Sequence, residues 1–400
     1  MSTSLEAAPT RPPAAPVAAA PARGGKTWLF NPWFDLVLVC FAVWPIIVLL
    51  RFLQLNSGWE NFKLQSSPLS MTFWQVYFLT TPHRWITLAL VFGDKDKFAE
   101  RPRMFTGLAL GAIGVCLVFL LGPTVLALFP QSQGAAGEVN WLALLVSLDF
   151  LIAVDYIWNA WHFAAQHSGI HRIYGRMSRP DVTRWAMFEK VVFRVFALYV
   201  LFRIALVAAL PAETLTQFRV ANEDALKNDW LPWLRNLDLL LLVACPLLLL
   251  VREFWDWRPS VRGRLIYLVS ALAVYGGALA LIHVYEGTPE TDAAGRQFWG
   301  NLTLSFVLAI AMFHATEYLA IVTWAVRRKR NLNGPLAQVV PTWGKALLIY
   351  MAALGVGGLI VDAGFAGLWV FMNLVVSFLH YGYDGMIWKQ PRPKPQPAAA

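Results

Sequence analysis

This chain alternates between long apolar stretches and short polar segments. Ten stretches are apolar over about twenty residues or more, and they lie at 33–53, 71–92, 104–129, 141–167, 186–210, 231–251, 264–285, 299–325, 343–363 and 366–388. A helix rises about 1.5 Å per residue, so about twenty residues cross a hydrocarbon core of about 30 Å. The pattern predicts an all-α fold, a polytopic bundle of about ten transmembrane helices.

The charges between these stretches alternate along the chain. Basic residues are concentrated after the second, fourth, sixth and eighth stretches, at positions such as Lys95, Arg172, Arg262 and Arg327. The segments after the third and ninth stretches contain no Lys or Arg, and those after the fifth and seventh carry acidic residues such as Glu213 and Glu286. Because cytoplasmic loops of membrane proteins are enriched in Lys and Arg, we expect both termini in the cytoplasm. The expected location is a bacterial cytoplasmic membrane.

The two ends of the chain differ in composition from the part between them. Residues 1–28 are rich in Ala and Pro and lack the basic segment and apolar core of a cleavable signal peptide. Residues 391–400 are similar in composition. We therefore expect a disordered cytoplasmic tail over 1–28, a single transmembrane domain over 29–390 and a disordered tail over 391–400.

The overall composition agrees with a membrane protein and excludes other classes. The chain is 58% hydrophobic and 14% charged, whereas a soluble domain is about 25% charged. Its net charge is +9, but the basic residues lie in loops rather than on one stripe or arm. Nucleic acid is therefore not an expected partner. The three cysteines lie apart in apolar stretches, which excludes a CxxC-type site.

All seven histidines lie within apolar stretches or on the helical turn just after one. Ionisable residues inside a membrane are costly, so each is a candidate functional residue. Four of them, His83, His162, His314 and His380, lie roughly ten residues before the first cytoplasmic charge that follows. They are therefore expected at one depth, and we call them the histidine layer. Glu317 is expected at the same depth.

Carboxylates accompany two of these histidines at helical spacing. His314 and Glu317 are separated by three residues, and His380 and Asp384 by four. Residues at these separations share one face of a helix. Each pair could therefore bind one ion together, or the carboxylate could hydrogen-bond the imidazole and orient it.

The fourth stretch contains a polar face and two further histidines. Asn159, His162 and Gln166 lie on one face of the helix, whereas His167 is rotated by about 140° from His162. One unbroken helix cannot direct both at one metal. Either His167 and His171 form a second layer with Asp384, or one set is structural, or a break near Gly169 redirects His171.

The remaining intramembrane charges are interpreted as structural. His283 lies near the external end of its stretch and is expected at the membrane interface. Arg203 and Arg235 are expected to pair with acidic residues such as Asp238.

Imidazole with a few carboxylates suits Zn, Cu or Fe, and open coordination positions favour non-haem iron and O₂. A metal inside an apolar bundle implies a lipid-like substrate that enters from the membrane. In this hypothesis the histidine layer supplies the ligands, and His167 and His171 are further candidates. Four polar residues complete the site: Glu317 as a ligand or acceptor, Asp384 orienting His380, and Gln166 and Asn159 bonding the oxygen species on the metal.

The pattern of histidines and acids resembles that of the histidine-motif integral-membrane non-haem iron oxygenases. These enzymes include fatty-acyl desaturases, hydroxylases and carotenoid-modifying enzymes. The resemblance covers about a quarter of the chain and is carried by His162-x4-His167-x3-His171, His314-x2-Glu317, His380-x3-Asp384 and His83. It implies iron-dependent oxidation of a hydrophobic substrate. The chain lacks an HxxHH box, has fewer histidines than desaturases and has more spans.

Two other classes of function use similar residues. A haem-binding membrane electron carrier would use histidines on facing helices as axial ligands, such as His83 with His314 or His162 with His380. A proton- or ion-coupled transporter would use the intramembrane His, Asp and Glu as a relay, although no inverted repeat is visible. Basic residues at the cytoplasmic ends, such as Arg172 and Arg176, either contact a head group or redox partner or follow the positive-inside rule.

Overall fold

The computed structural model describes residues 26–57, 68–127, 147–178, 185–207, 230–255, 257, 259–289, 291–328 and 333–388. Every regular element within these ranges is a helix. The tails expected over 1–28 and 391–400 lie outside the described residues, apart from positions 26–28. The all-α prediction therefore holds for the part of the chain that the structure describes.

The helices follow the apolar stretches closely. Their bounds are α1 Pro32–Phe34, the π-helix η1 Asp35–Val39, α2 Trp44–Asn56, α3 Met71–Phe73, the π-helix η4 Trp74–Thr80, α4 Thr81–Gly93, α5 Lys95–Glu100, α6 Pro102–Ala127, α8 Leu148–Ser178, α9 Ala186–Val207, α12 Leu231–Trp255, α13 Arg262–Gly287, α14 Ala293–Arg328, α15 Pro335–Val339 and α16 Trp343–Ile387.

Six segments of the described chain are long and apolar enough to cross a membrane: Pro32–Asn56, Pro102–Gly122, Leu231–Trp255, Pro259–Gly287, Ala293–Arg328 and Pro335–Ile387. The protein is therefore an integral membrane protein by the length and composition of its helices. Helices α4, α8 and α9 also form where spans are predicted, but they carry more polar residues. The count of ten spans and the side of each terminus stay predictions.

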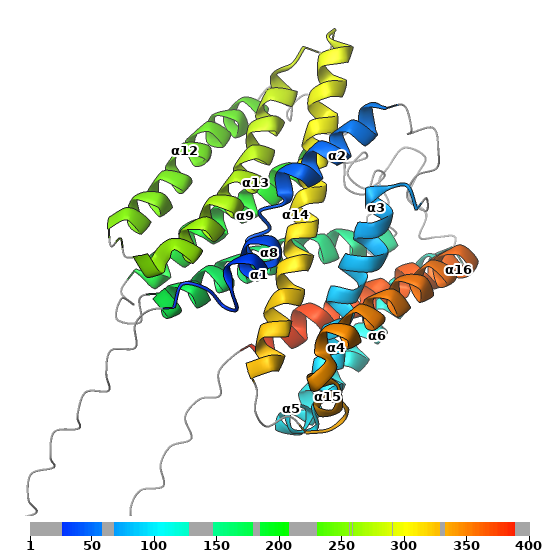
Figure 1. Ribbon diagram of the computed structural model, residues 1–400. Helices are drawn as coiled ribbons and strands as arrows, with labels where there is room; N and C mark the ends of the chain where they lie inside the picture. Colours follow the sequence, from blue (N-terminus) through cyan, green and yellow to red (C-terminus); the bar gives the residue numbers. More distant parts are fainter. Residues whose placement is uncertain are drawn as a thin grey trace, which may run out of the picture.

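Helices α8 and α14 connect two groups of helices (Figure 1). One group contains α2, α9 and α13, and the other contains α4, α6 and α16. Helix α14 runs through the middle of the bundle and contacts α13 and α2 on one side and α4 on the other. Helix α8 crosses the bundle and contacts α9 and α13 of one group and α6 and α16 of the other. The two helices that carry most of the histidines therefore meet at the centre of the molecule.

Helix α16 is interrupted at Phe365, where the backbone has φ −148° and ψ 63°. The chain turns back at this point (Figure 1), and Trp369 shares an apolar cluster with Leu359 and Val361 of the preceding half. Two predicted spans, 343–363 and 366–388, correspond to these two halves. The turn directs the second half of α16 into the bundle, where it contacts α4, α6 and α8.

The return of α16 depends on the absence of a side chain at Gly358. A methyl group there would lie 2.4 Å from the Trp369 ring. We expect Gly358→Ala to lower the free energy of unfolding by about 1–3 kcal/mol, because the two halves must separate. A melting curve of the purified protein in detergent micelles measures this effect.

Gly357 provides the matched control, because no atom lies within 4 Å of a methyl group built there. Gly357→Ala is expected to stabilise the helix by up to about 1 kcal/mol, since Ala is the better helix former. Equal melting temperatures for the two variants would contradict the packing role of Gly358.

A buried ion pair joins α9, α12 and α13 away from the histidine layer. Arg203 is fully buried, and its Nε and Nη2 atoms donate to the two carboxylate oxygens of Asp238 at 2.8 and 3.0 Å. Arg203 also contacts Glu286, and His283 Nδ1 lies 3.7 Å from Asp238 Oδ2. The predicted pairing of Arg203 with Asp238 is confirmed.

Candidate metal centre

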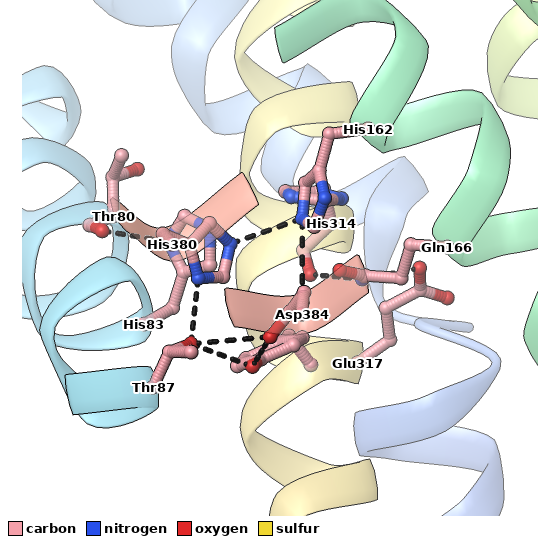
Figure 2. A network of polar contacts seen from close by, with 10 residues as sticks. Thr80, His83, Thr87, His162, Gln166, His314, Glu317, His380 and Asp384 are labelled. Atoms are coloured by element: carbon pink, nitrogen blue, oxygen red, sulfur yellow. Dashed lines mark hydrogen bonds and ion pairs between the residues drawn. The ribbon is translucent and has the colours of Figure 1, made fainter. Parts of the chain in front are cut away.

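Seven buried ionisable side chains from four helices converge inside the bundle, and all of them except His167 are labelled in Figure 2. None of them is more than 8% exposed. They are His83 on α4, His162 and His167 on α8, His314 and Glu317 on α14, and His380 and Asp384 on α16.

The four rings of the histidine layer contact one another edge to face. The ring centroids of His83 lie 5.1 Å from His314 and 5.0 Å from His380. Those of His162 lie 5.1 Å from His314 and 4.5 Å from His380. The residues that counting places at one depth are thus brought together by their helices.

The start of α4 fixes His83. The π-helix η4 ends at Thr80, and Pro82 opens α4, where its missing N–H costs little. His83 Nδ1 lies 2.6 Å from the Thr80 carbonyl oxygen, so Nδ1 carries the proton. The Nε2 atom is then left for a metal, which is the usual arrangement for a ligating histidine. π-Helical turns occur frequently at functional sites.

The first candidate ligand set, here called the first triad, consists of His162, His380 and Asp384. Its three donor atoms lie within 4.8 Å of one another. The Nε2 atoms of His162 and His380 are 3.0 Å apart, and Asp384 Oδ2 lies 3.8 Å from His162 Nε2. The predicted pair on α16 is therefore completed by a histidine of α8.

The second triad consists of His167, His314 and Glu317, again with donor atoms within 4.8 Å. His167 Nδ1 lies 2.9 Å from Glu317 Oε1. Both ring nitrogens of His314 are buried without a hydrogen-bond partner in the structure, as is His167 Nε2. A buried polar atom without a partner costs about 1–3 kcal/mol, so these nitrogens are explained well by a bound ion.

His83 lies between the two triads. It forms a third group of possible donors with His314 of the second triad and His380 of the first. The three groups share members, so they form one continuous cluster that could hold a metal ion.

Hydroxyl groups orient the first triad. Thr87 Oγ1 lies 2.7 Å from His380 Nδ1 and 2.7 Å from the Tyr318 hydroxyl, which donates to Asp384 Oδ1. These contacts leave His380 Nε2 directed at the centre. Neither residue is distinguished by the sequence pattern, although Thr87 is four residues after His83 and Tyr318 directly follows Glu317.

Tyr267 and Gln166 orient the second triad. The Tyr267 hydroxyl donates to Glu317 Oε2 at 2.8 Å and lies 2.9 Å from His167 Nδ1. The Gln166 amide donates to Glu317 Oε1 at 2.8 Å and to the His314 carbonyl at 2.9 Å. Gln166 therefore holds the carboxylate in place. Tyr267 lies on α13, and no pattern in that stretch distinguishes it from other apolar-face tyrosines.

Asn159 and His171, two of the predicted site residues, lie outside the cluster. Asn159 is half-buried one turn before His162 and belongs to none of the three groups. His171 Nε2 instead accepts from Arg264 Nε at 3.0 Å and lies 3.3 Å from Glu253 Oε1. Arg264 also pairs with Glu189.

The second layer of His167, His171 and Asp384 is not formed. His167 faces α14, His171 lies one turn further along among the charges of α12 and α13, and Asp384 joins His162. The expected rotation of His167 away from His162 has a simple consequence. His162 belongs to the first triad and His167 to the second.

Comparison with known proteins adds no relative of this chain. No protein-family model matches it, and neither a curated protein nor a solved structure matches it significantly. The function is therefore argued from the residues of the centre.

Proposed function

We propose that this protein is a membrane-embedded, iron-dependent oxidoreductase that acts on a lipid-like substrate. The observation that carries the proposal is the pair of triads, two separate sets of two histidines and one carboxylate within a buried cluster. Two histidines and one carboxylate are the ligand set of non-haem iron oxygenases, which keep coordination positions open. The motif resemblance to membrane oxygenases supports the same chemistry.

In this proposal each triad holds one iron ion, with His83 available to either. Iron held in this way supplies redox chemistry with O₂ at the positions that the protein leaves open. A structural zinc site, by contrast, is closed by four protein ligands. Thr87 and Tyr318 hold the first triad in position, and Tyr267 and Gln166 hold the second.

The packing of the histidine layer supports separate ions over haem. An iron with two axial imidazoles needs its two ligand nitrogens about 4 Å apart, from bonds of about 2 Å each, with a porphyrin between the rings. The nitrogens of His162 and His380 are 3.0 Å apart, and the His83 and His314 rings touch edge to face. These rings leave no space for a porphyrin.

The surroundings of the centre favour an apolar substrate. The Phe163 ring stacks on His314 with centroids 3.6 Å apart, and apolar side chains of the two helix groups pack on both sides. A substrate that reaches this site passes between apolar helices, so it would come from the bilayer. Electrons would come from a redox partner at the cytoplasmic face.

Metal analysis, an absorption spectrum and oxygen consumption together test the proposal. The purified protein is expected to contain iron, to show no Soret band, and to consume O₂ when a reductant and extracted membrane lipids are added. Removal of iron with a chelator should abolish the consumption, and added Fe(II) should restore it. A Soret band, or full activity after chelation, would overturn the proposal.

A further inference from the structure

Three basic side chains gather between α8 and α9, at the end of these helices that is predicted to face the cytoplasm. They are Arg172 of α8 and Lys190 and Arg194 of α9, and we call them the basic site. None of them takes part in the proposed iron chemistry. Like charges at close range repel one another, so their common position requires an explanation.

Two hydrogen bonds fix how α8 and α9 lie against each other. Near the start of α8 the Tyr156 hydroxyl donates to the Leu201 carbonyl, near the end of α9, at 2.7 Å. Further along α8, Arg194 Nε donates to Ser168 Oγ at 2.9 Å. As α8 proceeds, its contacts therefore move back along α9, and the two helices are antiparallel.

This arrangement brings the members of the basic site together. On α8, Arg172 lies one turn after Ser168, and on α9, Lys190 lies one turn before Arg194. In antiparallel helices these two steps run in the same direction, so Arg172 and Lys190 lie near each other beyond the hydrogen bond of Ser168 with Arg194. The charges of Arg172 and Arg194 both act on Lys190, in agreement with this geometry.

No described carboxylate neutralises the basic site. Glu189 is the neighbour of Lys190 in the sequence, but it is buried and pairs with Arg264 of α13 at 2.8 Å. Among the residues that the structure describes, none forms an ion pair with a member of the basic site. The site therefore offers three positive charges to an anion.

Arg194 is held in place by the protein itself. Its Nε atom donates to Ser168, and its guanidinium carbon lies 5.1 Å from the centre of the Trp161 ring. This cation–π contact fixes the plane of the guanidinium. Its two terminal nitrogens form no hydrogen bond with a residue of the described ranges, so both remain for a ligand. Arginine binds phosphate oxygens through such paired donors.

Exposed apolar side chains continue from the basic site toward the middle of the predicted spans. On α8, Ile157 is 69% and Trp161 49% exposed, and on α9, Val195 is 48% exposed. Trp161 precedes Arg172 by eleven residues, which is about three turns, so both lie on one face of α8. A ligand that covers the whole surface is charged at one end and apolar at the other.

We propose that the basic site binds the phosphate of an anionic phospholipid, whose acyl chains lie along the exposed apolar side chains of α8 and α9. Basic pockets between helices bind anionic head groups in other membrane proteins. A soluble acidic protein or a free phosphate ion would match the charges but would not cover the apolar surface. No member of the site belongs to either triad, so the inference goes beyond the proposed function and does not depend on it.

Two phospholipids with identical acyl chains test the class of ligand. Palmitoyl-oleoyl phosphatidylglycerol, which is anionic, and the zwitterionic phosphatidylcholine are titrated separately into the purified full-length protein in detergent. Binding is followed by native mass spectrometry. Phosphatidylglycerol is expected to bind at least about tenfold more tightly, since each Lys or Arg strengthens the attraction to an anionic lipid by about fivefold. Equal affinities for the two lipids would overturn the proposal.

Inorganic phosphate separates a lipid from a free anion. At the same concentration as the lipid, it is expected to leave the bound phosphatidylglycerol in place, because it lacks the acyl chains. Displacement by inorganic phosphate would show that the site recognises the phosphate group alone and would refute a lipid ligand.

Variants of the basic site locate the binding. Arg172→Gln and Lys190→Gln should each weaken the binding of phosphatidylglycerol by about fivefold and change that of phosphatidylcholine less. Each variant also removes a repelling charge, so its melting temperature without added lipid should be no lower than that of the parent protein. Unchanged phosphatidylglycerol affinity in both variants would assign the charges to another partner and refute the lipid site.

Arg328→Gln is the matched control for net charge. Arg328 also lies over a tryptophan, with its guanidinium carbon 4.7 Å from the centre of the Trp324 ring, but it is at the end of α14. This variant should bind phosphatidylglycerol as the parent protein does. A loss equal to that of Arg172→Gln would show that the net charge of the protein, rather than the basic site, attracts the lipid.

Discussion

Asp384→Ala is expected to reduce the iron content of the purified protein from about two ions per chain to about one. The first triad would keep only His162 and His380, whereas the second triad lies on α8 and α14 and loses nothing. Even residues that only orient a ligand cost about 10–100-fold in metal affinity when they are changed, so loss of a ligand should empty the site. Metal analysis after gel filtration measures the content.

Glu317→Ala is the equivalent substitution in the second triad, and it should also leave about one iron ion per chain. The double variant should contain none, because each triad has then lost its carboxylate. His171→Gln is the control, since His171 is buried on the same helix but contacts Arg264 and Glu253. If either single variant loses all iron, the two triads act as one shared site and the assignment of two ions is wrong.

Arg203→Met is expected to cause the largest loss of stability, about 3–5 kcal/mol, which is the usual effect of breaking a buried ion pair. Asp238 is 1% exposed and would remain as a buried charge without its cation. Glu286 loses the same partner. Unfolding in mixed micelles with increasing SDS, followed by the helical circular dichroism signal, measures the change.

A second variant shows whether charge or packing causes this loss. Arg203→Met combined with Asp238→Leu removes both members of the pair and should recover most of the stability, because well-packed apolar replacements are often neutral. Tyr199 donates to Asp238 Oδ1 at 2.7 Å, so its hydroxyl would then lose a partner. A double variant as unstable as the single variant would show that the unpaired charge of Asp238 does not cause the loss.

The amino-acid sequence predicts the helices well because a long apolar stretch inside a membrane can adopt only one regular structure here. Residues of α13 and α14 are apolar on most sides, and a chain in hydrocarbon has to satisfy its backbone internally, which only a helix can do here. The interruption of α16 at Phe365 is also visible in the sequence, as two adjoining stretches. The packing of one helix on another is not visible, because it depends on contacts such as Gly358 with Trp369.

The candidate site is predicted in part. Counting residues from charged loops places the histidine layer at one depth, since depth in a membrane follows from helical rise. The hydrogen-bond or ligand partner of each histidine cannot be predicted from the sequence, because it depends on how the helices are rotated about their axes. The sequence thus groups His167 with His171, whereas the structure places it against Glu317. Tyr267 and Tyr318 escape notice because tyrosine is common in membrane helices.

The return of the chain at Phe365 also has a consequence for biosynthesis. His380 and Asp384 lie on the second half of α16, and the first triad takes both of them. During synthesis the nascent protein can insert α4, α8 and α14 long before these two residues leave the ribosome. The complete cluster can therefore assemble only after the second half of α16 has been synthesised. A ribosome that stalls before residue 380 releases a chain that keeps only His162 of the first triad.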